Sequence, residues 1–210
     1  MKYLGYIIFL LWLGSCGQGK KYHDDDSKSV EELPVGIKAI LEYQDKQNEE
    51  FRNPETSPLP DRYRKDFEGL DFFPPDTNYI VTAAFKRTAN AKPFQMPSNT
   101  DENTWEVVYG IVHFELNGTE HQLEVYQGLE LMNREGFKDY LFLPFLDLTN
   151  GEETYGGGRY LDLTIPEGEQ MVIDFNKAYN PYCAYNKRYS CPITPKENDL
   201  PIAINAGIKI

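Results

Sequence analysis

Residues 105–127 read WEVVYGIVHFELNGTEHQLEVYQ, and they contain the strongest turn signal of the chain at Asn117-Gly118. This dipeptide suits a two-residue β-hairpin turn, and apolar and polar residues alternate on both sides of it. The turn sets a register in which Phe114 faces His121. His113 then lies on the opposite face of the sheet from His121, so these two histidines cannot share a metal ion.

One face of this predicted hairpin is apolar and is expected to face the core. Its residues are Val108, Val112, Phe114, Leu116, His121, Leu123 and Val125. Turn signals separate seven segments with strand patterning, at residues 79–85, 105–116, 119–127, 140–148, 160–165, 171–175 and 201–206. Strands in sequence without intervening helices predict a mainly β fold, an antiparallel barrel or sandwich of about seven or more strands. The barrel is preferred because long adjacent hairpins curl readily.

One amphipathic helix is expected before the strands. Residues 29–32, Ser-Val-Glu-Glu, have the spacing of a capping box. A helical stripe follows at Ile37, Ile40, Leu41 and Phe51, and Asn53-Pro54 is expected to end it. Residues 29–210 are therefore expected to form a single β-rich domain with an N-terminal helix.

The N-terminus has the features of an exported lipoprotein. Residues 1–15 have a basic start and an apolar run too short to span a bilayer, which is typical of a signal peptide. Residues 13–16, Leu-Gly-Ser-Cys, resemble the lipobox, and we expect acyl chains on Cys16 to anchor the protein. Residues 16–28 predict a flexible tether. Residue 17 is Gly and not the aspartate that often retains such lipoproteins at the inner membrane, so the resemblance implies the outer membrane of a Gram-negative cell. The alternative to a lipobox is an ordinary signal peptide with a coincidental cysteine.

The net charge and the cysteines of the chain limit which partners, metals and cross-links are expected. A formal net charge of −12 argues against nucleic acid, whose binding needs Lys and Arg to neutralise phosphates. In an oxidising compartment, Cys183 and Cys191 are expected to form a disulfide. No histidine follows His121, so zinc lacks further ligands there, and we expect neither a metal nor a cofactor.

A second hairpin is predicted from residues 160–165 to residues 171–175, through the loop at 166–169. Its register would place Arg159, Asp174 and Asn176 on one face. A guanidinium beside a carboxylate and an amide is a reasonable anchor for a polar ligand group. The alternative is a structural salt bridge that closes the sheet. A loop longer or shorter by one residue would move one strand's side chains to the opposite face of the sheet.

Three motifs resemble an uncharacterised bacterial family, domain of unknown function 1684. They are YGGGRYLD at 155–162, DFNKAYNPYCAY at 174–185, and CP at 191–192 followed by PKEN at 195–198. Segments 57–59 and 67–74 are similar to earlier parts of the same family. Asp199 and Ile208 depart from the charged residues of the family pattern. The matching positions that could touch a ligand are Tyr155, Arg159, Asp174, Asn176, Tyr179, Asn180, Glu197 and Asn198.

The resemblance implies kinship and no activity, so three functions stay open. The first is a lipid-anchored, monomeric binding module for a small polar or glycan-like ligand, suggested by the amide and aromatic residues around Tyr179. The second is a hydrolase that uses Asp174 or Glu197 as general acid or base. The third is a structural envelope lipoprotein.

Overall fold

The computed structural model of the chain describes residues 34–210. The helices are α1 (Val35–Arg52) and α2 (Asp61–Arg64), with short 3-10 helices η2 (Thr77–Tyr79), η3 (Leu131–Asn133), η4 (Phe175–Lys177), η5 (Tyr182–Ala184) and η6 (Lys196–Asn198). The strands are β1 (Ile80–Arg87), β2 (Phe94–Met96), β3 (Thr104–Leu116), β4 (Thr119–Gly128), β5 (Tyr140–Phe145), β6 (Arg159–Thr164) and β7 (Gln170–Asp174). The predicted signal peptide, tether, capping box and Cys16 anchor lie outside the described residues.

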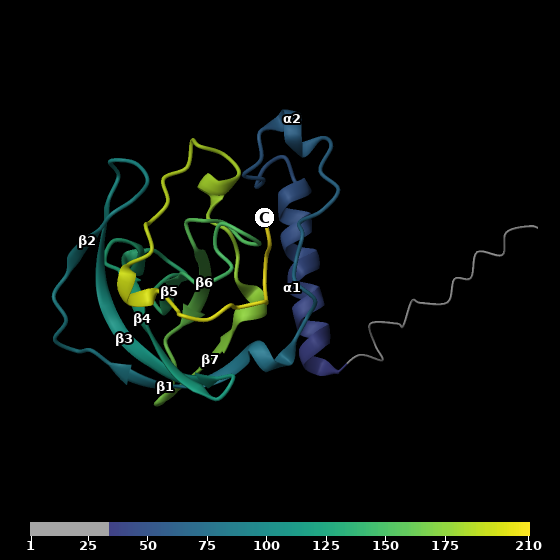
Figure 1. Cartoon of the computed structure of the whole chain (residues 1–210). Helices are drawn as coiled ribbons and strands as arrows, with labels where there is room; N and C mark the ends of the chain where they lie inside the picture. Colours follow the sequence, from purple (N-terminus) through teal and green to yellow (C-terminus); the bar gives the residue numbers. More distant parts are fainter. Residues whose placement is uncertain (1–33) are drawn as a thin grey trace, which may run out of the picture.

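The strands form a seven-stranded sheet in the order β6-β5-β4-β3-β1-β7, with β2 pairing β3. All of the paired strands are antiparallel. The sheet curls into a half-barrel beside α1 (Figure 1). The prediction of a mainly antiparallel β fold is confirmed. Across residues 34–210 the sheet is a single curled layer with β6 and β7 at its edges, rather than a closed barrel or a two-sheet sandwich.

The β3–β4 hairpin has the predicted register, with Phe114 opposite His121. Asn117 (φ 53°) and Gly118 (φ 75°) both have positive φ, as a two-residue turn of this type requires. A bulge between Val108 and Gly110 shifts the register by one residue near the start of β3. Val108 therefore lies on the face away from the main core, and its assignment to the core face was wrong.

The predicted hairpin between β6 and β7 is wrong. β6 pairs with β5, whereas β7 pairs with β1 at the other edge of the sheet. The Ile165 amide donates to the Asp139 carbonyl, and the Phe85 amide donates to the Glu169 carbonyl. The two ends of the 166–169 connection are thus hydrogen-bonded to different parts of the sheet. The connection links the two edge strands, β6 and β7, and does not form the tight turn of a hairpin.

The last expected strand, at 201–206, is also absent among the strands of the described chain, and β2 is the strand that the sequence did not indicate. Residues 201–206 run as an irregular segment across the end of the core. The carbonyls of Ile204 and Ala206 accept hydrogen bonds from the Arg159 guanidinium instead of from a strand partner.

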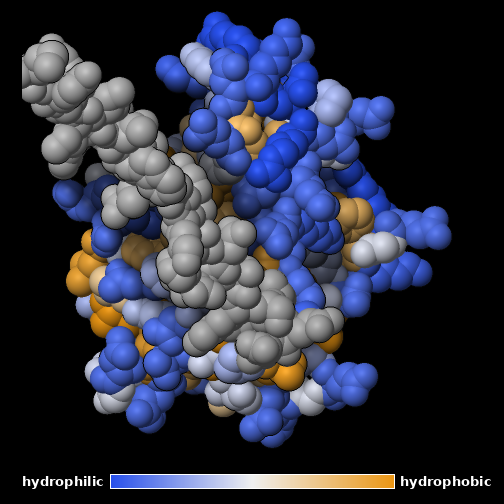
Figure 2. Space-filling view, turned by 90° about the vertical axis from the view of Figure 1, so that its right-hand side faces the viewer, coloured by the Kyte–Doolittle hydropathy of each residue, from blue (hydrophilic) through white to orange (hydrophobic). Residues whose placement is uncertain are grey.

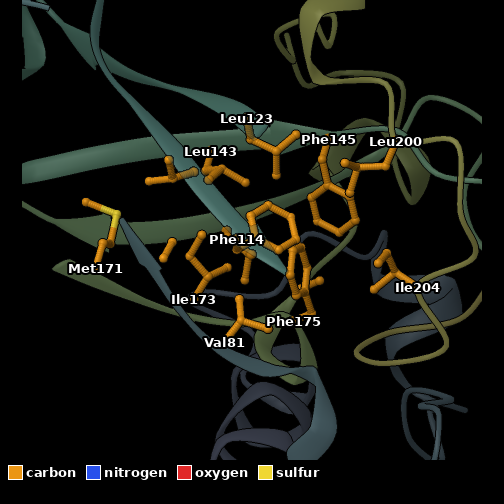
Figure 3. Close-up of a cluster of buried hydrophobic side chains, with 14 of the residues drawn as sticks. Val81, Phe114, Leu123, Leu143, Phe145, Met171, Ile173, Phe175, Leu200 and Ile204 are labelled. Atoms are coloured by element: carbon orange, nitrogen blue, oxygen red, sulfur yellow. The ribbon is translucent and has the colours of Figure 1, made fainter. Parts of the chain in front are cut away.

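The main core fills the concave face of the sheet with aliphatic and aromatic side chains (Figure 3). At its centre, the ring of Phe175 lies 5.3 Å from that of Phe145 and 5.7 Å from that of Phe114. Ile204 of the C-terminal segment is fully buried and closes one end of this core. Burial of these side chains supplies the main driving force for folding.

Helix α1 ends at Arg52, as Asn53-Pro54 predicted. It buries Ile40 and Phe51, and the ring of Phe51 lies 4.9 Å from that of Tyr185 in the loop after β7. The face of the molecule where α1 lies is mostly hydrophilic where it is visible (Figure 2). Within residues 34–210, no helix combines the length and the apolar character needed to cross a membrane.

Candidate functional site

A pocket of about 740 Å³ lies between α1 and the face of the sheet opposite the main core. We call it the tyrosine pocket, because Tyr43, Tyr140, Tyr160, Tyr179, Tyr182 and Tyr189 line it. Its remaining walls come from α1, from β3–β6, from η3 and from the loop at residues 179–192. A volume of this size suits a small organic ligand.

Strand alternation determines which side chains enter the pocket. Tyr140 and Phe142 of β5 line the pocket, whereas Leu141 between them is buried in the main core. Tyr160 and Asp162 of β6 follow the same rule. Because successive side chains of a strand point to opposite faces, a single sheet builds both the core and the pocket floor.

Asp162 connects two strands with the loop that follows η4. The hydroxyls of Tyr140 and Tyr179 donate to its Oδ1 at 2.8 and 2.6 Å. Antiparallel backbone pairing between Tyr160 and Tyr179 holds the loop in place. Burial first, and the Asp162 charge second, raise the pKa of both Tyr140 and Tyr179 far above the ordinary tyrosine value. Both phenols are therefore neutral donors at physiological pH.

Glu106 is a second carboxyl group in the pocket, and it is only 8% exposed. It lies opposite Gly128 on β4, where an added Cβ would come within 3.1 Å of Glu106 Oε1. The absence of a side chain at position 128 therefore leaves room for this carboxyl group. Burial raises the pKa of Glu106, and the hydroxyl of Thr104 opposes the shift. Within the described residues, no lysine or arginine forms an ion pair with it.

The outer wall combines α1 with the 179–192 loop. The Tyr182 hydroxyl donates to Glu50 of α1, and the Tyr43 hydroxyl donates to the Lys177 carbonyl at 2.9 Å. The rings of Tyr182 and Tyr189 meet edge to face, with centroids 5.2 Å apart. These contacts fix aromatic surfaces opposite the strand floor.

The groups that the pocket presents to a ligand are mainly aromatic rings and carboxylates. Aromatic faces can stack on an apolar or cationic surface, and the carboxylates accept hydrogen bonds from hydroxyl or ammonium donors. Trp105 lies at the pocket with 45% of its surface exposed. In residues 34–210 no cluster of three or more His, Cys, Asp or Glu side chains is placed to hold a metal ion.

Arg159, the centre of the predicted anchor, is fully buried outside this pocket. Its Nη2 donates to Asp147 Oδ2 and to the Ile204 carbonyl, each at 2.8 Å. Burial lowers the pKa of the guanidinium, and the Asp147 charge opposes that effect. The shared face with Asp174 is wrong because β6 and β7 do not pair. The structural salt bridge, the alternative reading, is present, but its carboxylate is Asp147.

Asp174 and Asn176 do contact each other, at the start of η4. Asn176 Nδ2 donates to Asp174 Oδ1 at 2.9 Å, and Lys177 Nζ lies 3.6 Å from Asp174 Oδ2. The side-chain amide of Asn176 also accepts from the backbone N–H of Asp76 through Oδ1 and donates to the backbone carbonyl of Asp76 through Nδ2. Asn176 thus pairs with a distant backbone segment as another strand would.

Asn198 plays a similar role between β4 and β5. Its Oδ1 accepts from the Glu124 amide at 2.7 Å, while its Nδ2 donates to the carbonyls of Glu124 and Pro144. The side chain is completely buried. It therefore bridges two strands whose direct pairing is limited to Tyr126 and Phe142.

The other candidates are also placed outside the pocket, except Tyr179. Asn180 is buried and donates to the Lys209 carbonyl and to the Tyr185 hydroxyl. Glu197 is exposed on η6, and Tyr155 is half-buried near the cysteines. Neither Glu197 nor Asp174 lines the pocket, so nothing in its geometry favours the hydrolase that used these residues.

Cys183 and Cys191 are adjacent free thiols in this structure. The Cys183 amide donates to Cys191 Sγ at 3.2 Å. Burial raises the pKa of Cys191, which also lines the pocket. The disulfide remains a prediction that their proximity permits.

Sequence reasoning missed Glu106 and Tyr140 and did not single out Asp162. Asp162 stands in the YGGGRYLD motif, next to residues that were chosen. Asp162 could have been recognised because it is a charged residue between Leu161 and Leu163 in a predicted strand. Strand alternation places such a residue on the face of the sheet away from the core. Glu106 carried no such signal, because its burial depends on the bulge in β3 and on Gly128.

Comparisons with known proteins agree with the fold and bring no activity. The family model described as a protein of unknown function (DUF1684) matches residues 65–209. An uncharacterised protein of Haloarcula marismortui, with a solution NMR structure, is similar at 30% sequence identity and a TM-score of 0.64. The alignment covers 82% of this chain and 92% of that one. No curated protein matches the chain.

Proposed function

Because the chain belongs to DUF1684, a family of proteins of unknown function, we propose its function from the site itself: it binds a small polar, glycan-like ligand in the tyrosine pocket. The observation that carries the proposal is the Asp162 carboxylate, held by two tyrosine hydroxyls among further aromatic side chains. Sugar-like ligands present hydroxyl donors at their edge and an apolar face on their ring. A fixed carboxylate between aromatic surfaces is complementary to both.

Rigidity of the site supports binding with little rearrangement. Both hydrogen bonds to Asp162 reach Oδ1, and within residues 34–210 no protein group donates to Oδ2. One carboxylate oxygen thus orients the side chain, while the other is free to accept from a ligand. Preorganisation of this kind increases affinity because less side-chain freedom is lost on binding.

Intrinsic fluorescence provides a direct test. The chain has two tryptophans, Trp12 and Trp105, and the second lies at the pocket. Trp12 lies in the predicted signal peptide, so in a Trp12→Phe background Trp105 is the one tryptophan whether or not residues 1–15 are removed. Titration with glucose, N-acetylglucosamine and maltose is expected to give a saturable change in its emission. Asp162→Asn should weaken binding about tenfold, because a hydrogen bond to a charged group is lost. The exposed Asp139→Asn is the matched control.

The proposal fails if none of these sugars produces a saturable signal, or if Asp162→Asn binds them as tightly as the parent does. Circular dichroism of the variant separates loss of binding from loss of fold.

We also propose that the protein is a monomer held at the outer membrane of a Gram-negative cell by acyl chains on Cys16. The lipobox-like residues 13–16 support this placement. Mass spectrometry of the mature N-terminal peptide should show a diacylglyceryl cysteine at position 16, and Cys16→Ala should release the protein from membranes. An unmodified Cys16 in a membrane-free mature protein would overturn the proposal.

A further inference from the structure

We propose that the tyrosine pocket recognises a protonated amino group, with Glu106 as its counter-ion. The inference deepens the proposed function, on which it rests, because it assigns a chemical class to the ligand of the same pocket. An amino sugar or a small amine alcohol would satisfy both statements. An anionic ligand such as a phosphate ester would satisfy neither.

The walls of the pocket carry more acidic than basic side chains. Glu50, Glu106, Glu130 and Asp162 line it, against Lys46 and Arg134. Both cationic residues are exposed, and so are Glu130 and Asp162. Within the described residues, neither of them forms an ion pair with a pocket carboxylate. Four carboxyl groups against two cations leave the pocket lining with an acidic excess, which favours a cation over an anion.

Glu106 is a buried carboxyl group of the pocket. The residue is more than nine-tenths buried, yet in the part of the chain that the structure describes no lysine or arginine forms an ion pair with it. Burial without a cationic partner disfavours the carboxylate and raises the pKa of Glu106, although the Thr104 hydroxyl opposes this shift. A ligand ammonium would supply the missing charge and would donate hydrogen bonds to the carboxylate.

Aromatic side chains form much of the pocket wall. The rings of Phe142 and Tyr160 lie 4.8 Å apart, edge to face, and Tyr179 continues the row at 5.9 Å from Tyr160. Aromatic faces attract cations through their quadrupole, and the attraction increases in a desolvated site. The Tyr140 and Tyr179 hydroxyls both donate to Asp162 Oδ1, so they are not free to donate to an anionic ligand. Asp162 Oδ2 and the Glu106 carboxylate remain as acceptors for the donors of a cationic ligand.

Matched probe pairs test the inference on the full-length chain in the Trp12→Phe background. Glucosamine is compared with glucose, and butane-1,4-diamine with butane-1,4-diol, so that each pair differs in the replacement of hydroxyl by amine. We expect each amine to bind at least about tenfold more tightly than its partner, in line with one charge-assisted contact. Added NaCl should weaken the amines and leave the neutral partners unchanged.

Glu106→Gln should abolish the preference for the amine within each pair. Glu115→Gln is the control, because Glu115 lies on the same strand and is exposed outside the tyrosine pocket. If Glu106→Gln does not fold, the effect of NaCl on the parent protein decides whether the pocket binds a cation. Only an ionic contact would be weakened by NaCl for the amine and not for its neutral partner.

The outcomes separate the two proposals. Equal binding within both pairs, no binding by either amine, or a preference that survives in Glu106→Gln overturns the inference, while sugar binding keeps the proposed function. Amines that bind where all neutral sugars fail support the inference and overturn the glycan-like ligand.

Discussion

Arg159 and Asp147 form an ion pair at 2.8 Å in which both side chains are completely buried. The guanidinium also holds the carbonyls of Ile204 and Ala206, so this pair fastens the C-terminal segment to the beginning of β6. Asp147 in turn accepts from the amides of Thr149 and Ile204. Both terminal nitrogens of Arg159 and both carboxylate oxygens of Asp147 thus have protein partners, so the pair is structural, and neither residue lines the pocket.

Arg159→Met is expected to lower the free energy of unfolding by about 3–5 kcal/mol, since it leaves a buried carboxylate without its partner. Urea denaturation measures the effect. The exposed Arg62→Met serves as the control and should change stability little. A loss below about 1 kcal/mol for Arg159→Met would contradict the structural role.

Asn198→Ala should destabilise the fold by about 2–3 kcal/mol, because Glu124 and Pro144 lose hydrogen bonds in a buried position. The Glu124 amide should also exchange with deuterium faster. Asn205→Ala, at an exposed position, is the matched control. Unchanged exchange at Glu124 would show that the side chain does not bridge β4 and β5.

Gly158→Ala is expected to cost about 2 kcal/mol or more, since Gly158 has φ of 90° and an added Cβ would lie 2.6 Å from the Phe145 carbonyl. Gly156→Ala in the same glycine run should be tolerated, because its nearest atom would be at 3.7 Å. Thermal denaturation of both variants provides the comparison. Equal melting temperatures would rule out the close approach at Gly158.

Oxidation should join Cys183 and Cys191 and raise the free energy of unfolding by about 2–3 kcal/mol, by the loop-entropy estimate. Mass spectrometry should detect the loss of the two thiol hydrogens, and Cys183→Ser should remove the gain. In the reduced protein, Cys191 should alkylate slowly at neutral pH, because burial raises the pKa of its thiol. Fast alkylation of Cys191 would contradict its burial.

Glu106→Gln should be more stable than the parent at neutral pH. Burial raises the pKa of Glu106, so the folded state holds this proton more tightly than the unfolded state. The associated stability is present at acid pH and is lost as the pH rises through the raised pKa. The advantage of the variant should therefore shrink as the pH falls to about 4. Urea unfolding over a pH series measures it, and a difference that is constant with pH would count against the shift.

Local signals predicted only part of the fold. The β3–β4 hairpin followed from Asn117-Gly118, because a two-residue turn fixes its own register. The end of α1 at Arg52 followed from Asn53-Pro54. The connection at 166–169 carried a comparable turn signal, but its strands pair with β5 and β1, which no local pattern encodes.

The candidate site was predicted less well. Tyr179 lies in the pocket, whereas the family motifs mainly supplied residues that hold loops and strands together, namely Arg159, Asn176, Asn180 and Asn198. A polar side chain in a motif looks the same in sequence whether it binds a ligand or a backbone carbonyl. The difference lies in what surrounds it after folding.

The sequence by itself determined the antiparallel β class, the helix over α1, the β3–β4 register and membership of the family, because these depend on alternation, turns and motifs close together in the chain. The tertiary structure decided the strand order, the partner of Arg159 and the pocket around Asp162 and Glu106. These depend on contacts between distant segments, and such contacts are selected by burial and hydrogen-bond satisfaction over the whole core.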